Sequence, residues 1–237
     1  MVELKAYVTG ADRGLGFSLT KILLKNNYTV FAGKYLNDWH DLNRLKEEYP
    51  DKLKMLPLDL ANDESVYKAA KIIKEQTEYL DLIINNAAVY LDDGEDVLGD
   101  LKFDSMRRMY EINTLGPLKV TNSVIDLLIN GKKKILLNIS SEAGSIGDCW
   151  RKREFGYAMS KSALNMQTAI LKNHLEEYGI RILLLHPGYL KTYMLGKKNM
   201  DADIEADESA INIYKLLQDE NNYTDLYYDY QGNLLPW

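Results

Sequence analysis

The sequence predicts an α/β fold: a doubly wound, mainly parallel sheet of seven strands with helices on both faces. Short apolar runs alternate with helix-like segments along the whole chain of 237 residues. The runs LIIN, ILLNI and RILLLH are apolar at consecutive positions, which is typical of central parallel strands covered on both sides. A glycine-rich turn, TGADRGLG at residues 9–16, joins the first strand to the first helix. Ligands of such folds bind at the carboxyl ends of the strands.

Strands and helices are expected in regular alternation. The strands are expected at residues 5–9, 29–33, 54–58, 82–85, 134–139, 180–186 and 226–230. The helices are expected at residues 14–26, 39–49, 63–77, 103–114 continuing towards 130, 157–178 and 207–219. We see no internal repeat, low-complexity segment or linker. Residues 1–237 are therefore expected to form a single domain.

Composition argues against several classes of partner. The chain has 29 basic and 35 acidic residues, so nucleic acid and anionic membranes are poor candidates. No run of about 18 apolar residues predicts a membrane span, and the first strand begins too early for a secretory signal. A single cysteine, Cys149, excludes an internal disulfide and fits the reducing cytoplasm. His40, His174 and His186 lack ligand spacing, so no metal site is expected.

The first strand ends in the glycine turn. Gly10, Gly14 and Gly16 let a strand turn sharply into a helix while a phosphate approaches the bare backbone. The helix N-terminus then offers free N–H groups and a positive dipole end. The spacing is GxxxGxG rather than the usual GxGxxG, which indicates a narrower group of nucleotide-binding proteins. The alternative is a tight turn without a ligand.

The second strand ends at Lys34 and Tyr35, where NAD-binding domains often carry an acid for the ribose 2′-hydroxyl. No acid follows this strand, and Arg13 lies inside the glycine turn. Two cations favour a 2′-phosphate, hence NADP(H) over NAD(H). Lys34 as a solvated loop residue is the alternative, and Tyr35 in place of a second Arg leaves dual specificity open.

The third and fourth strands end in small or acidic residues. Asp59 could accept the adenine amino group, or it could cap the helix that starts near Asp63. The fourth strand ends in the sequence NNAA at residues 85–88. These small residues allow a cofactor to lie against the backbone.

The fifth strand ends at Ser140 and Ser141, and Tyr157 and Lys161 follow on one face of a long helix. A lysine ammonium beside a tyrosine lowers its pKa and makes it a usable proton donor or acceptor near neutrality. The pair therefore predicts an acid–base site. A surface helix pair is the alternative.

The Tyr-x-x-x-Lys spacing alone is weak evidence because the chain has 17 tyrosines. It recurs at Tyr67/Lys71, which has no active-site partner, and at Tyr193/Lys197, which lies in an irregular stretch. Only Tyr157 begins a long helix after a Ser-Ser strand end, and that context selects it.

The sixth strand ends in HPG, and Thr192 beyond it offers a hydroxyl where a nicotinamide carboxamide would lie.

Together these residues resemble the short-chain dehydrogenase/reductase family, whose fold is the Rossmann fold. TGADRGLG, NNAA, Asn113, the Ser-Ser strand end, YAMSK and HPGYLKT follow the family's order across nearly the whole chain. Within the family the chain is similar to short carbonyl-reductase-like members related to the bacterial C-factor proteins and the insect Sniffer protein. The residues behind this are Arg13, the short segment after Thr192 and the ending YQGNLLPW.

The resemblance implies a role for each matching residue. Tyr157 would be the general acid, Lys161 would lower its pKa and hold the nicotinamide ribose, and Ser141 would bind the substrate carbonyl oxygen, with Ser140 as the less favoured choice. Asn113 would anchor a water that links Lys161 to solvent. The cofactor-binding residues would be Gly10, Arg13, Gly14, Leu15 and Gly16 around the phosphates, Asp59 and Leu60 at the adenine, Asn86 and Ala87 at the ribose, and Pro187, Thr192, Tyr157 and Lys161 at the nicotinamide end. Lys34, which its charge alone places near a 2′-phosphate, completes the predicted set.

Two features depart from the family pattern. Ala88 stands where the family usually has glycine. The spacing from Ser141 to Tyr157 is a few residues longer than in many members, so residues 149–153 are expected to form a loop over the substrate mouth. Substrate specificity is expected to lie in this loop and in residues 193–204.

The function implied is NADP(H)-dependent interconversion of a ketone or aldehyde and an alcohol by hydride transfer, in one dinucleotide-binding and catalytic domain. The alternative is a non-catalytic NAD(P)-binding signalling or redox-sensing protein, which would not need the intact Ser, Tyr, Lys and Asn set. A structural role in a larger assembly has no specific support.

A homodimer or homotetramer is expected, because family members commonly pair the helix after strand four and the helix that carries the tyrosine. The second helix has small residues and offers Leu164, Met166 and Ile170 as apolar contacts. A monomer is the alternative, if the longer loop before Tyr157 covers this surface.

Overall fold

The computed structural model describes residues 3–36, 39–92, 94, 96–194, 196–219 and 225–237. Seven strands form one sheet in the order β3-β2-β1-β4-β5-β6-β7, and every neighbouring pair is parallel. The strands are β1 (Leu4–Val8), β2 (Tyr28–Lys34), β3 (Leu53–Pro57), β4 (Leu82–Asn85), β5 (Ile135–Ile139), β6 (Arg181–His186) and β7 (Tyr227–Asp229). The predicted fold class is confirmed, and the sheet is wholly parallel.

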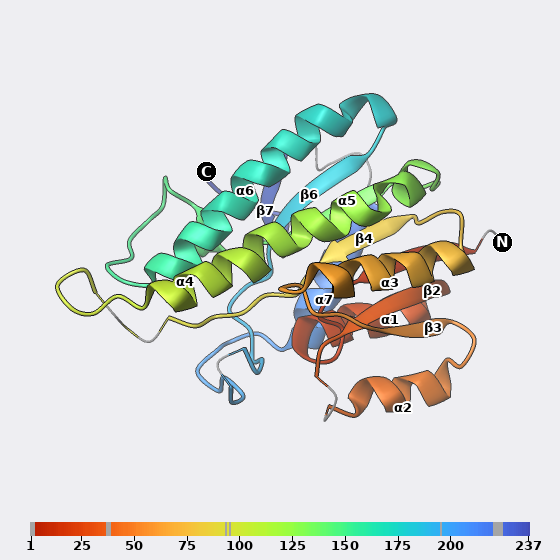
Figure 1. Cartoon of the computed structure of the whole chain (residues 1–237), viewed down its shortest axis with the longest axis horizontal. Coiled ribbons are helices and arrows are strands. Elements are labelled where there is room, and N and C mark those ends of the chain that lie inside the picture. The colour runs from red at the N-terminus through yellow and green to blue at the C-terminus, as the bar shows by residue number, and fades with distance from the viewer. Residues whose placement is uncertain (1–2, 37–38, 93, 95, 195, 220–224) are drawn as a thin grey trace.

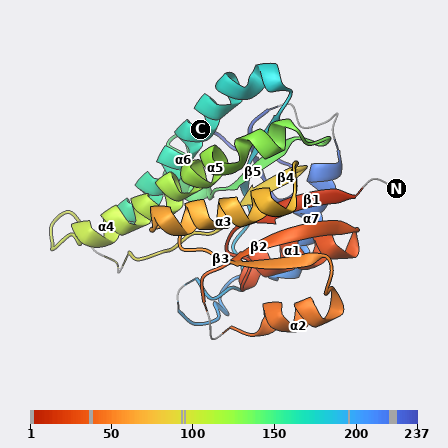
Figure 2. The ribbon, with the colours of Figure 1, turned by 45° about the vertical axis from the view of Figure 1, so that its right-hand side comes forward.

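Helices cover both faces of the sheet (Figure 1). On one face lie α3 (Asp63–Gln76), α5 (Gly116–Ile129) and α6 (Phe155–Leu175). On the other lie α1 (Gly14–Lys25), α2 (Asp41–Glu48) and α7 (Ala206–Gln218), as the turned view in Figure 2 also shows. Short 3-10 turns occupy Glu142–Gly144 and Glu176–Tyr178.

Strand alternation divides the core into two layers. In β1, Tyr7 packs with the α3, α5 and α6 layer, whereas Ala6 and Val8 pack with the α1 and α7 layer. All three side chains are at most 1% exposed. Successive strand side chains point to opposite faces, so a strand buried on both faces must be apolar at every position. This explains the uninterrupted apolar runs of β4, β5 and β6.

One predicted helix is broken. The segment expected as a continuous helix from residue 103 towards 130 is α4 (Phe103–Tyr110), a π-helical turn (Glu111–Leu115) and then α5. Pro117 lies in the first turn of α5 and has no N–H to donate to the carbonyl of residue 113, so the regular hydrogen-bond ladder cannot run through this point. Such π-helical turns are common at functional sites, and this one holds Asn113.

The order of the strands places a crevice between β1 and β4. The chain moves from β1 outward to β3 and then returns to β4 on the other side of β1, so the helices that follow β1 and β4 leave on opposite faces. Ligands of open α/β sheets bind outside the carboxyl ends of the strands at this reversal. Within the described residues, no helix combines the length and apolarity needed to span a membrane.

Candidate active site

The glycine turn after β1 has little room for side chains. Gly10 and Gly14 have φ angles of +63° and +55°, a region that L-residues with a Cβ rarely adopt. A Cβ on Gly16 would lie 2.1 Å from the Gly10 carbonyl oxygen, so α1 packs directly on the turn. No side chain caps the N-terminus of α1, and no acid stands in its first turn. This helix end fits a phosphate.

Asn86 after β4 fastens the glycine turn in place. Its Nδ2 donates to the carbonyl oxygens of Thr9 at 3.0 Å and Gly10 at 3.2 Å. Its backbone N–H donates to Thr9 Oγ1 at 3.0 Å, and Ala87 N–H donates to the same oxygen at 3.1 Å. A Cβ on Gly10 would lie 2.9 Å from Ala87 Cα. The glycine turn is therefore fixed against the end of β4, at the point where α/β sheets bind dinucleotides.

A carboxylate from the glycine turn lies at the end of β2. Asp12 from the glycine turn is 4% exposed, and its Oδ1 accepts from Tyr35 N–H at 3.4 Å. Ala11 N–H donates to Gly33 O at 2.9 Å, which holds the turn beside β2. No acid follows strand two in the sequence, but in the fold the Asp12 carboxylate lies beside the residues that follow it. The carboxylate was missed because it comes from a different turn.

Arg13 and the segment after β6 meet above the crevice. The Arg13 guanidinium lies 5.8 Å from the Trp39 ring centroid, and Trp39 meets Tyr193 edge to face at 4.8 Å. A Cβ on Gly14 would lie 3.3 Å from Thr192 Cγ2, so Thr192 borders the glycine turn. The segment expected to carry specificity, residues 193–204, therefore starts against the cofactor crevice. Residue 195 within it lies outside the described residues.

The remaining predicted cofactor residues lie at the same edge of the sheet. Asp59 Oδ1 accepts from Ala61 N–H at 2.9 Å, whereas Asn62 caps α3, so the capping role considered for Asp59 belongs to Asn62. Leu60 is buried against Gly116 of α5, and Leu15 is a core residue of α1. Pro187 follows β6, and its carbonyl accepts from Ser209 Oγ at 2.7 Å.

The two serines after β5 point to different environments. Ser140 Oγ donates to Asn165 Oδ1 of α6 at 2.6 Å and is buried in the core. The Ser141 side chain instead shares a hydrogen bond with Tyr157, and its Oγ accepts from Ala143 N–H at 3.2 Å. Because neighbouring side chains of an extended strand point to opposite sides, only Ser141 faces the tyrosine hydroxyl.

Tyr157 and Lys161 lie together near the start of α6, but their electrostatics differ from the expectation. Burial raises the pKa of Tyr157 to about 12, and the hydrogen bond with Ser141 opposes this. Lys161 is 2% exposed, its Nζ donates to Ile139 O at 2.9 Å, and burial lowers its pKa to about 7. The expected lowering of the Tyr157 pKa by Lys161 is wrong for this arrangement, because burial acts on both groups and penalises their charged forms.

Asn113 is fixed by three hydrogen bonds. Its Oδ1 accepts from Val89 N–H at 2.8 Å, and its Nδ2 donates to Val89 O at 2.9 Å and to Ser160 Oγ at 3.1 Å. Ser160 Oγ donates in turn to Tyr157 O at 2.7 Å. The π-helical turn is therefore tied both to the segment after β4 and to the first turn of α6.

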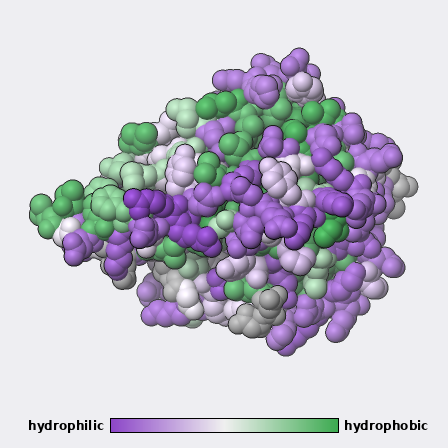
Figure 3. Space-filling model, in the orientation of Figure 1, coloured by the Kyte–Doolittle hydropathy of each residue, from purple (hydrophilic) through white to green (hydrophobic). Residues whose placement is uncertain are grey.

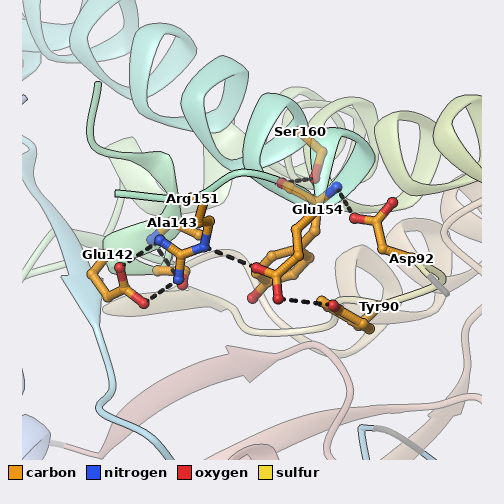
Figure 4. Close-up of polar contacts among 9 residues, drawn as sticks. Tyr90, Asp92, Glu142, Ala143, Arg151, Glu154 and Ser160 are labelled. Carbon is orange, nitrogen blue, oxygen red and sulfur yellow. Dashed lines mark hydrogen bonds and ion pairs between the residues drawn. The ribbon is translucent and has the colours of Figure 1, made fainter. Parts of the chain in front are cut away.

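Four polar residues beside Tyr157 were not singled out for a role by the sequence analysis: Tyr90, Glu142, Arg151 and Glu154 (Figure 4). Arg151 belongs to the loop expected over the substrate mouth, and its side chain is 10% exposed. Glu154 precedes α6 with φ +65°. Tyr90 comes from the segment after β4, so no local pattern pairs it with Glu154. Arg151 and Glu154 are three residues apart, which is the one local signal that could have marked this group.

Comparisons with known proteins agree with this geometry. The family model described as short chain dehydrogenase matches residues 5–203. The chain belongs to the short-chain dehydrogenase family. It is 33% identical over 159 residues to the C-signal protein of Myxococcus xanthus, covering 67% of this chain and 93% of that one. It is 34% identical over 187 residues to 1-hydroxy-2-glutathionyl-2-methyl-3-butene dehydrogenase of Rhodococcus sp. (strain AD45), covering 78% of this chain and 77% of that one.

Two solved structures of carbonyl reductases superpose closely on this chain. The NADPH-bound carbonyl reductase from chicken fatty liver has a TM-score of 0.87 at 28% identity, and the match covers 100% of both chains. The carbonyl reductase Sniffer of Drosophila melanogaster has a TM-score of 0.89 at 24% identity over 100% of both chains, which shows the shared fold. The expected resemblance to the carbonyl-reductase-like members is confirmed. Among the described residues, no three His, Cys, Asp or Glu side chains gather as metal ligands would.

Proposed function

We propose that this short-chain dehydrogenase is an NADP(H)-dependent enzyme that interconverts a ketone or aldehyde and an alcohol. The observation that carries the proposal is the meeting of Ser141, Tyr157 and Lys161 at the same edge of the sheet as the glycine turn. We also propose that residues 1–237 act as one domain, in the cytoplasm, where a lone exposed Cys149 would stay reduced.

Each residue of the site has a distinct part in this reaction. The α1 N-terminus and Arg13 hold phosphate, and Lys161 Nζ, fixed on Ile139 O, has N–H groups left for ribose hydroxyls. The nicotinamide group supplies or takes the hydride when it is bound. Ser141 donates to the substrate carbonyl oxygen and positions it against Tyr157. Tyr157 gives its proton to that oxygen during reduction, and its raised pKa keeps the proton in place until negative charge develops there.

The direct test is NADPH oxidation followed at 340 nm (the nicotinamide absorbance) with a panel of small ketones and aldehydes. Turnover of at least one carbonyl compound is expected. Cofactor binding without any turnover across the panel would favour the non-catalytic NAD(P)-binding protein that the sequence left open.

Cofactor preference is expected to follow the charges around the end of β2. NADPH should bind at least about tenfold more tightly than NADH, since one charge-assisted hydrogen bond contributes about 1.5–3 kcal/mol. Lys34→Ala should weaken NADPH binding and leave NADH binding nearly unchanged. Asp12→Asn should increase the preference for NADPH, because the buried carboxylate repels a 2′-phosphate. Dissociation constants from fluorescence titration test this, and equal values for the two cofactors would refute it.

The chain is expected to form a homodimer or homotetramer through α5 and α6. Met159, Met166 and Ile170 on α6 are 55%, 63% and 58% exposed, and apolar side chains gather over this helix (Figure 3). Leu164 is not available as expected, since it is 1% exposed in the chain's own core. Light scattering at micromolar concentration should give a multiple of 27.2 kDa. Met166→Glu should shift the mass towards the monomer, and a wild-type mass of one chain would contradict the interface.

A further inference from the structure

A continuous chain of polar contacts lies beside the catalytic hydroxyls. Arg151 Nη1 donates to Glu142 Oε2 at 2.8 Å, and Arg151 Nε donates to Glu154 Oε2 at 2.8 Å. Glu154 Oε1 accepts from the Tyr90 hydroxyl at 3.1 Å. Figure 4 shows these contacts as one connected path, and we call Tyr90, Glu142, Arg151 and Glu154 the mouth cluster.

The mouth cluster borders the place where a substrate carbonyl would sit. Glu142 directly follows Ser141, and Glu154 lies three residues before Tyr157. The Tyr90 ring centroid is 5.2 Å from that of Tyr157. The charges of Glu142, Arg151 and Glu154 all act on the pKa of Tyr157.

The one cation of the mouth cluster is already engaged by protein carboxylates. Arg151 donates hydrogen bonds from both terminal nitrogens to Glu142 and from Nε to Glu154. Its side chain is 10% exposed, and the Trp150 ring lies 4.7 Å from the guanidinium carbon. A bidentate arginine–carboxylate pair is strong and geometrically specific. A carboxylate on a substrate would therefore have to displace a glutamate to gain this arginine.

The charge of the mouth cluster is negative. Two carboxylates and one guanidinium leave one net negative charge. Lys161 adds only part of a positive charge near pH 7, because burial lowers its pKa to about 7. His186 has its pKa lowered by burial and stays neutral near pH 7. Like charges in a partly desolvated pocket repel strongly.

We propose that the mouth cluster makes the enzyme selective for carbonyl substrates without a negative charge near the carbonyl group, and that Glu142 and Glu154 are its specificity-determining residues. This inference rests on the proposed function, since it assumes that a carbonyl compound sits at Ser141 and Tyr157. Neutral and cationic aldehydes or ketones are accepted, and carboxylate-bearing ones are rejected by repulsion. The aromatic ring of Tyr90 and the carboxylates of the two glutamates can accommodate a cation.

Binding can be measured without turnover. Three para-substituted benzaldehydes carrying a methyl, a carboxylate or a trimethylammonium group are titrated by calorimetry into the enzyme saturated with tetrahydro-NADP, whose uncharged ring has no hydride to transfer. The carboxylate compound should bind at least about tenfold more weakly than the methyl compound, and the cationic compound at least as tightly as the methyl compound. The ratio of the dissociation constants of the carboxylate and methyl compounds is called the affinity gap. Raising the salt concentration from about 0.02 M to about 0.5 M should reduce this gap.

Neutralising either glutamate should reduce the discrimination. Glu142→Gln and Glu154→Gln keep the side-chain size and an acceptor oxygen, and each should bring the gap to about threefold or less. Asp126→Asn on α5, whose side chain is 58% exposed and paired with Lys74, is the matched control and should leave the gap unchanged.

Three results would overturn the inference: equal affinity for the carboxylate and methyl compounds, an unchanged gap in both glutamine variants, or no binding of any of the three compounds. Failure of the proposed function is seen separately. It would appear as absence of NADPH oxidation with every carbonyl compound, whereas the order of affinities in the tetrahydro-NADP complex does not depend on turnover.

Discussion

Tyr157→Phe is expected to lower kcat by about 10²–10⁴-fold while the dissociation constant for NADPH changes little. The variant removes only the hydroxyl that shares a hydrogen bond with Ser141, and the aromatic ring that packs against Tyr90 remains. The loss should therefore appear in the chemical step and not in the fold. Steady-state kinetics with a substrate from the carbonyl panel, with NADPH titration in parallel, measures both quantities.

The chain provides its own control for this variant. Tyr67 has the same spacing to a lysine four residues later, but it is 64% exposed on α3. Tyr67→Phe should leave kcat and the cofactor affinity unchanged. Ordinary activity in Tyr157→Phe would place the proton donor elsewhere and remove the basis of the proposed site.

Lys161→Met is expected to abolish measurable turnover, weaken cofactor binding and stabilise the fold. The amine is 2% exposed and donates to Ile139 O. Its loss removes an N–H donor from the nicotinamide end of the site, so the dissociation constant for NADPH, measured by fluorescence titration, should rise, and turnover should fall below detection. Methionine fills a similar volume without burying a charge. Lys71→Met is the matched control, because the Lys71 side chain is 77% exposed.

The stability effect has a defined pH dependence. Burial lowers the pKa of Lys161 from 10.5 to about 7, so the folded chain penalises the ammonium form. The penalty is full below pH 7 and is relieved as the pH rises from about 7 towards 10.5. Lys161→Met should therefore raise the free energy of unfolding on the order of 2–4 kcal/mol at pH 6, and much less at pH 10. Urea denaturation without added cofactor at both pH values measures this, and an equal change at the two would contradict it.

The sequence predicted the strands well and located the glycine turn, because both depend on local patterns. Uninterrupted apolar runs are required of strands buried on two faces, and β4, β5 and β6 were found within a residue or two of their expected bounds. Gly10, Gly14 and Gly16 could be interpreted locally, because one turn alone requires their backbone conformation and lack of a Cβ. Tyr157 was separated from Tyr67 and Tyr193 by what precedes each of them along the chain. Helix 103–130 was predicted as continuous because the effect of Pro117 on the preceding turn was not weighed.

The features that only the tertiary structure decided depend on how loops fold and pack, and not on local periodicity. Asp12 reaches the end of β2 because the glycine turn lies against Gly33, and no pattern after β2 records that carboxylate. Arg151 finds Glu142 and Glu154 because residues 142–154 fold back on themselves beside α6. The sign of the pKa shifts of Tyr157 and Lys161 depends on how completely the surrounding chain excludes water. Periodicity and turn chemistry act over a few residues and are therefore legible in a sequence, whereas burial and charge pairing are set by the packing of the whole fold.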